Sequence, residues 1–136
     1  MSITLTKGGR VIGIGTDIIE VERIQNSHTK FKDRFLNRIY TEGEQAYCLA
    51  RKNPYPHLAA RFAAKEAVSK CFTTGIGDRL GWKDIDIVKG ERGEPYVRLG
   101  EGGRELLAEV GGSEVLVSLS HTALVGHAVA VIVRTD

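Results

Sequence analysis

The spacing of apolar residues divides the chain into a mainly helical first part and a mainly extended second part. Apolar residues alternate over 11–18, which predicts a strand. Helical spacing then predicts helices from about Ile18, over 41–51 and over 57–72, with a second basic and aromatic piece over 30–40. Alternation returns and predicts strands over 84–88, 95–99, 115–120 and 128–133, with a short helix over 102–110. Helices followed by strands indicate an α+β fold with packed helices and an antiparallel sheet, and without a linker we expect a single domain over 1–136.

The segment 57–72 is the strongest predicted element, and we expect it to be the long central helix. It is rich in alanine, contains no Gly or Pro, and carries a stripe of small apolar side chains that suits close packing. The spacing of Thr41 and Glu44 predicts a capping box at the start of the preceding helix. An Asn-Pro-Tyr-Pro run separates the two helices.

The strand over 11–18 carries an unusual acid. Gly13, Gly15 and Asp17 share one face, so we expect open space beside the carboxylate. An unpaired carboxylate among isoleucines and glycines is costly to bury. Two interpretations stay open: Asp17 caps the following helix, or it is a metal ligand.

A second acid lies in the central helix. Glu66 and Lys70 are four residues apart, so one interpretation is a surface ion pair. The helix also concentrates Arg61 and Lys65 around that carboxylate, and two carboxylates with Lys and Arg would suit a magnesium-bound polyphosphate. His121, at a strand end, either completes a hydrogen-bond network or contacts substrate phosphate or ribose.

Composition and charge exclude several classes of protein. The 136 residues include 42% hydrophobic and 26% charged residues, typical of a globular protein, and no apolar run is long enough to cross a bilayer. The net charge of +2 argues against a nucleic-acid-binding coat, although residues 1–70 carry 12 basic and 7 acidic side chains. The two cysteines form no disulfide framework, and residues 1–10 lack the apolar core of a signal peptide, so we expect a cytoplasmic protein.

Several motifs together resemble one family. They are G-I-G-T-D-I over 13–18, E-R-I over 22–24, R-F-A-A-K-E-A-V-S-K over 61–70, G-I-G over 75–77, G-E-P-Y over 93–96 and V-S-L-S-H-T over 117–122. In this order they are similar to the holo-[acyl-carrier-protein] synthases, the small single-subdomain type of the 4'-phosphopantetheinyl transferase superfamily. The resemblance implies a compact α+β fold, assembled as a homotrimer with active sites between subunits. It also implies transfer of the phosphopantetheine arm of coenzyme A to a serine of apo-acyl carrier protein, in fatty acid biosynthesis.

The resemblance also implies roles for individual residues. Asp17 and Glu66 would hold Mg²⁺ against the coenzyme A pyrophosphate. Larger relatives carry a further acid where this chain has Ile19, so this chain would supply only these two carboxylates. Lys70 would stabilise charge on the attacked phosphate, and either Glu66 or a metal-bound water would accept the serine proton. The coenzyme A contacts would come from Arg61, Lys70, Gly75, Ile76, Gly77, His121 and Thr122.

The basic excess in the first half would then have a partner. Residues 23–38 carry five basic side chains against one acid, and the resemblance implies that Arg23, Lys30 and Arg34 bind the acidic carrier protein. RNA would compete for such a patch, but Phe31 and Phe35 share a face with Ile39 and are expected in the core, so we expect no nucleic-acid partner. Two alternatives stay open: a Mg²⁺-dependent hydrolase of a nucleotide diphosphate, and a non-enzymatic module that binds an acidic partner.

Overall fold

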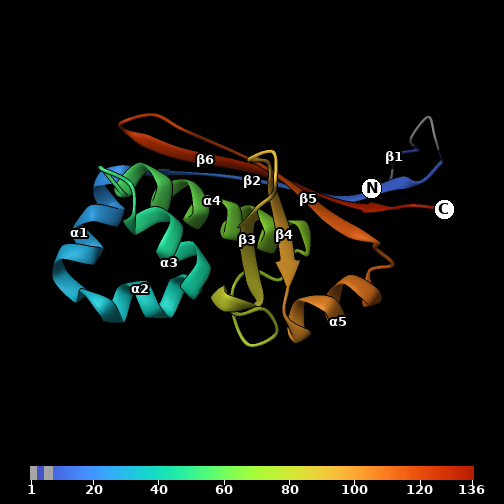
Figure 1. The fold of residues 1–136 in the computed structure, drawn as a ribbon. Helices are drawn as coiled ribbons and strands as arrows, with labels where there is room; N and C mark the ends of the chain where they lie inside the picture. Colours follow the sequence, from blue (N-terminus) through green and yellow to red (C-terminus); the bar gives the residue numbers. More distant parts are fainter. Residues whose placement is uncertain (1–2, 5–7) are drawn as a thin grey trace.

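A four-stranded antiparallel sheet forms one layer of the protein, and the helices lie under one of its faces (Figure 1). The computed structural model describes residues 3–4 and 8–136. The sheet has the order β1-β2-β6-β5, with β1 (Ile3–Thr4), β2 (Arg10–Glu20), β6 (Val125–Arg134) and β5 (Glu114–His121). A separate hairpin pairs β3 (Ile85–Lys89) with β4 (Pro95–Leu99). The helices are α1 (Val21–Phe31), α2 (Asp33–Ile39), α3 (Glu42–Leu49), α4 (Tyr55–Cys71) and α5 (Glu101–Glu109), with a 3₁₀ turn η1 (Trp82–Asp84).

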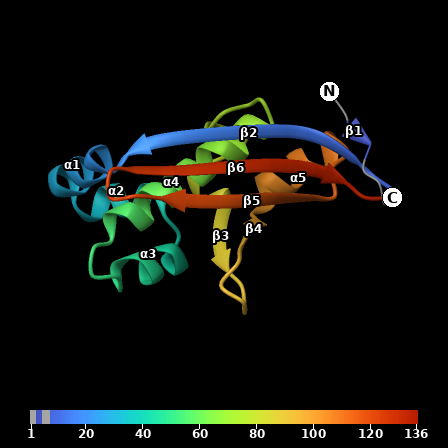
Figure 2. The same cartoon turned by 90° about the horizontal axis from the view of Figure 1, so that it is seen from above.

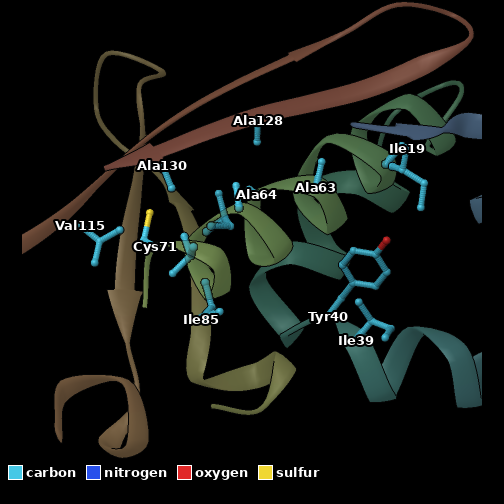
Figure 3. Close-up of a cluster of buried hydrophobic side chains, with 14 of the residues drawn as sticks. Ile19, Ile39, Tyr40, Ala63, Ala64, Cys71, Ile85, Val115, Ala128 and Ala130 are labelled. Carbon is cyan, nitrogen blue, oxygen red and sulfur yellow. The ribbon is translucent and has the colours of Figure 1, made fainter. Parts of the chain in front are cut away.

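Helix α4 is the central element, and it packs along the sheet over β2, β6 and β5 (Figure 2). Its contact stripe is made of small buried side chains, which allow the helix backbone to come close to the strands. The facing strands carry glycines at the contact points. A Cβ atom at Gly13, Gly15 or Gly126 would collide with the α4 backbone at Cys71, Ala67 or Ala59. Figure 3 shows Ala63 and Ala64 on this side of the helix, with Ala128 and Ala130 above them on β6.

The other elements cover the ends and the lower side of α4. Helices α1, α2 and α3 gather at the end where α4 begins, and α5 lies toward the opposite end (Figure 1). The β3–β4 hairpin projects on the β5 side of the molecule (Figure 2). Among residues 3–4 and 8–136, no helix covers the upper face of the sheet (Figure 1), and Ile14, Ile18 and Leu116 on it are 57%, 63% and 48% exposed.

The predicted α+β class and antiparallel sheet are confirmed, and so are most of the predicted elements. The capping box at Thr41 and Glu44 is present. Helix α4 begins at Tyr55, two residues earlier than predicted, because Pro56 lies in its first turn, where a missing N–H costs no hydrogen bond. Strand β1 was not predicted. The expectation that residues 1–10 lack the apolar core of a signal peptide falls partly on residues 1–2 and 5–7, which lie outside the described part.

The prediction for residues 30–40 is wrong in one respect. Lys32 has φ +52° and ψ −131°, so α1 ends at Phe31 and a new helix starts at Asp33. The four-residue spacing of Phe31 and Phe35 therefore crosses a break. Phe31 is exposed instead of buried in the core, whereas Phe35 is half-buried and Ile39 is buried.

Candidate functional site

Asp17 lies in β2, on the face of the strand that is turned toward α4. Strand β2 continues to Glu20, which is the residue that precedes α1, so the interpretation of Asp17 as a helix cap is wrong. The expected open space beside it is also absent. A Cβ on Gly15 would lie 3.0 Å from Lys70 Cβ and 3.1 Å from the carbonyl carbon of Ala67. The glycines of β2 thus allow the strand to approach α4 closely, which brings the Asp17 carboxylate beside the last turns of the helix.

Lys70 joins the helix to the strand at this point. Its ammonium group forms an ion pair with Asp17, with Nζ 3.0 Å from Oδ1, and donates a hydrogen bond to the Thr16 carbonyl at 2.9 Å. The Lys70 side chain is half-exposed, while most of the Asp17 side chain is covered. The spacing of Glu66 and Lys70 suggested an ion pair between these two residues of the helix. Lys70 instead pairs with Asp17 of β2.

Glu66 completes a cluster of two carboxylates and one ammonium group. Partial burial, followed by the charge of Asp17, raises the pKa of Glu66, and Lys70 opposes that effect. Such a carboxylate pair suits a hard divalent cation, because the cation would offset the repulsion between the two charges. In the described residues no group of three or more His, Cys, Asp or Glu side chains meets, so Asp17 and Glu66 fit a cation that takes its other ligands from water or phosphate.

A second polar cluster lies where α4 begins, near the end of β5. The rings of His57 and His121 are 4.6 Å apart, and His57 also stacks edge-on against Tyr47. The Arg61 guanidinium lies over the same Tyr47 ring at 4.2 Å, and Arg61 is only 8% exposed. Burial, followed by the charges of His121, Arg61 and Arg51, lowers the pKa of His57. The Arg61 and Arg51 guanidinium groups, which both lie over the Tyr47 ring, are the cations that this cluster offers to an anion.

Within one chain the predicted coenzyme A residues do not all come together. Arg61 and Lys70 are nine residues apart on α4, so they point to opposite sides of the helix and lie about 13 Å apart along its axis. The loop with Gly75, Ile76 and Gly77 follows the Lys70 end of the helix. His121 lies at the other end, against His57.

Thr122 also belongs to the His121 end of the molecule. Its hydroxyl oxygen accepts hydrogen bonds from the Leu124 and Val125 N–H groups, both at 3.1 Å, and thereby shapes the β5–β6 turn. The backbone N–H of Thr122 donates to the Val125 carbonyl at 2.9 Å. The structure therefore places the predicted substrate residues in two separate groups.

The predicted carrier-binding residues lie together on the α1–α2 surface. Arg23, Lys30 and Arg34 are all exposed. Lys30 and Arg34 lie over the Phe31 ring, at 5.2 and 5.7 Å from its centre. Beside them is a pocket lined by Ser27, Phe31, Arg34, Phe35, Arg38, Ile39 and Trp82. An apolar pocket with a basic rim can hold an apolar side chain of an acidic partner.

Three site residues were not found by the sequence reasoning. His57 and Tyr47 were passed over because an isolated ring in a helix gives no spacing signal. Lys65 was expected with Arg61 around the Glu66 carboxylate, but this is wrong: Lys65 is fully buried and paired with the equally buried Glu44 at 2.8 Å. The position of Lys65 opposite the alanine stripe on α4 could have indicated that it faces a different neighbour from Glu66.

Comparisons with known proteins agree with the motifs. Residues 13–131 match the model of the 4'-phosphopantetheinyl transferase superfamily. The chain is 50% identical over 121 residues to holo-[acyl-carrier-protein] synthase of Chlamydia muridarum, a match that covers 89% of this chain and 94% of that protein. The corresponding protein of Chlamydia caviae is 51% identical over 118 residues, covering 87% and 93% of the two chains.

Solved structures give the same result. Holo-[acyl-carrier-protein] synthase of Neisseria meningitidis aligns with a TM-score of 0.83 at 35% identity, covering 90% of this chain and 98% of that one. The synthase of Helicobacter pylori, solved in complex with coenzyme A, aligns with a TM-score of 0.78 at 33% identity, covering 88% and 98%. The family that the motifs predicted is thereby confirmed: the chain belongs to the 4'-phosphopantetheinyl transferase superfamily.

Proposed function

We propose that this chain is a holo-[acyl-carrier-protein] synthase. It transfers the 4'-phosphopantetheine arm of coenzyme A to a serine of apo-acyl carrier protein and releases adenosine 3',5'-bisphosphate. The observation that carries the proposal is the cluster of Asp17, Glu66 and Lys70 in a chain of this superfamily. Two carboxylates and an ammonium group provide what transfer from a pyrophosphate requires, a cation site and a positive group for the phosphate.

Asp17 and Glu66 would hold Mg²⁺, which when bound polarises the pyrophosphate and stabilises the leaving bisphosphate. The chain's own groups act around it. Lys70 is half-exposed, so its ammonium group is accessible and would exchange its Asp17 contact for an oxygen of the attacked phosphate. Glu66 lies in the same cluster as Lys70, so its carboxylate is our candidate to accept the proton of the carrier serine.

The direct test incubates the purified protein with coenzyme A, Mg²⁺ and an apo-carrier protein. The carrier should gain the mass of the phosphopantetheine arm, and Asp17→Ala and Glu66→Ala should each abolish the gain while the circular dichroism spectrum stays native. Absence of any mass gain with several bacterial-type carriers would sink the proposal. Release of free phosphopantetheine would indicate a hydrolase instead, and carrier binding without transfer and without a need for Mg²⁺ would indicate a binding module.

The carrier protein docks on the basic surface of α1 and α2, which includes Arg23, Lys30 and Arg34. Complementary charge accelerates encounter and weakens as salt rises. The exposed Phe31 and the adjoining pocket add an apolar contact that salt does not screen. We therefore expect KM for the carrier, and not KM for coenzyme A, to rise with ionic strength and with Arg34→Ala.

The protein assembles as a homotrimer through the uncovered face of its sheet. In register across β2, β6 and β5, this face presents an apolar row of Ile14, Val131 and Leu116. Exposed aliphatic side chains in contiguous rows are typical of a protein interface. A monomer by light scattering at micromolar concentration would refute the trimer, and Ile14→Glu should weaken it.

A neighbouring copy would also complete the coenzyme A site, because one chain separates its two groups of substrate residues. The Lys70 group of one copy would face the Arg61 and His121 group of the next. Mixing distinguishes this arrangement from a site within one chain. Lys70→Ala and His121→Ala proteins, each inactive alone, should recover activity when co-assembled, since some interfaces then combine two intact halves.

The biological setting remains part of the proposal. We place the protein in the cytoplasm and in fatty acid biosynthesis. Both of its cysteines, Cys48 and Cys71, are buried free thiols, which suits a reducing compartment. In the described part of the chain, no helix has both the length and the apolar character needed to cross a membrane.

A further inference from the structure

A fully buried ion pair lies on the side of α4 that faces α3, η1 and β3, away from the sheet. Lys65 Nζ is 2.8 Å from Glu44 Oε1, and neither side chain is exposed to solvent. The same ammonium group donates to the carbonyl oxygens of Trp82 at 2.9 Å and Ile85 at 2.6 Å. Three acceptors match the three N–H donors of a lysine, so the group is satisfied as a cation.

Glu44 extends the network to two further elements. Its Oε1 accepts the Thr41 N–H and its Oε2 accepts the Ile87 N–H, both at 2.8 Å. The pair therefore links α4 to the start of α3, to η1 and to β3. Buried ion pairs of this kind generally add little stability compared with an apolar pair of the same size. They differ from apolar contacts in that their hydrogen bonds are directional, and charged hydrogen bonds fix the positions of their partners.

Helix α4 needs such a directional contact. Its sheet-facing side is built from Ala59, Ala63, Ala64 and Ala67 against strand glycines, which sets how closely the helix approaches the sheet. Small apolar side chains present shallow ridges, so they oppose rotation of the helix about its own axis only weakly. The Lys65 hydrogen bonds point to atoms of three other elements, and they resist that rotation.

Rotation of α4 matters because Glu66 follows Lys65 in the sequence. Side chains extend about 5–6 Å from a helix axis, so a rotation of about 10° displaces the Glu66 carboxylate by about 1 Å. A functional constellation tolerates about 0.5 Å. We propose that Lys65 and Glu44 are positioning residues, whose buried ion pair fixes the rotation of α4 and holds Glu66 opposite Asp17. The inference rests on the proposed Mg²⁺ role of those two carboxylates.

The test separates geometry from stability with a double variant. Lys65→Met or Glu44→Gln alone leaves one buried polar partner unsatisfied and should unfold more easily. Glu44→Gln/Lys65→Met removes both charges with little change of volume but leaves the Trp82 and Ile85 carbonyls without their donor, so it should fold and its melting temperature should fall less than that of either single variant. If the pair positions Glu66, this folded double variant still binds Mg²⁺ about 10-fold more weakly by calorimetry without coenzyme A. Its kcat should also fall 10- to 100-fold with little change in KM for coenzyme A.

The control is Leu106→Ala, a core truncation on α5 that should lower the melting temperature but leave Mg²⁺ affinity unchanged. A folded double variant with wild-type Mg²⁺ affinity and kcat would overturn the inference. A double variant that does not fold would also overturn it, since the pair would then serve stability. A wild-type chain that binds no Mg²⁺ would overturn the proposed metal site itself and this inference with it.

Discussion

Gly15→Ala is expected to separate β2 from α4 and disrupt the proposed site of Asp17, Glu66 and Lys70. The added Cβ would lie 3.0 Å from Lys70 Cβ and 3.1 Å from the Ala67 carbonyl carbon, with the Ala67 oxygen closer still. Unstrained carbon–carbon contacts are about 3.5–4.0 Å, so strand and helix must move apart by roughly 0.5–1 Å. Overpacking of this size costs about 1–3 kcal/mol. The 3.0 Å contact between Lys70 and Asp17 would open to beyond hydrogen-bond distance.

The matched control is Gly43→Ala. Gly43 lies inside α3, and nothing lies within 4 Å of a Cβ at this position. Alanine there should stabilise the helix by roughly 0.5–1 kcal/mol. Urea unfolding, Mg²⁺ calorimetry and the carrier-modification assay would be run on both variants at one protein concentration. We expect Gly15→Ala to lose stability, Mg²⁺ affinity and about 10²-fold in transfer rate. If Gly15→Ala were as stable and as active as Gly43→Ala, the close approach of β2 and α4 would not position the site.

Three further predictions concern charge and backbone strain. Burial and Asp17 raise the pKa of Glu66, so its charged form destabilises the fold above that pKa. Glu66→Gln should therefore stabilise the metal-free protein at pH 7 in urea unfolding, and the gain should vanish below pH 4.5. For the same reason Mg²⁺ affinity, measured by calorimetry from pH 8 to pH 5, should begin to fall at a higher pH than an ordinary glutamate would give, and a fall only near 4.5 would contradict this. Lys32→Gly should relieve the strain of the positive φ and raise the free energy of unfolding by about 1 kcal/mol, seen as a higher urea midpoint. Lys32→Ala should give no such rise, because alanine also disfavours positive φ.

The fold was largely predictable because most of its elements carry local signals. Period-two alternation identified the long strands, and alanine content identified α4. The break at Lys32 was not predictable, since nothing in a Lys-Phe-Lys-Asp run indicates positive φ. Strand β1 was missed because a two-residue strand is defined only by pairing with β2.

The cluster of Asp17, Glu66 and Lys70 was predictable for a chemical reason, and its surroundings were not. A carboxylate among apolar residues stands out in a sequence, so Asp17 was identified, and a dense run of charges in an alanine-rich helix identified Glu66 and Lys70. The glycines of β2 were misinterpreted, because the same absence of a side chain serves an open space and a close contact equally well. Only the tertiary position of α4 decides between them.

The density of charged residues in the 61–70 segment follows from the geometry of one helix. At about 100° per residue, side chains four residues apart share one side of a helix, so Arg61 and Lys65 leave one side of α4 and Glu66 and Lys70 leave another. Arg61 points toward Tyr47, Lys65 toward Glu44, and Glu66 and Lys70 toward β2. The alanines between them occupy the remaining side, where a larger residue would push the helix off the sheet. Three sides of this segment are therefore constrained, so a motif of ten residues is more specific here than the short glycine motifs elsewhere in the chain.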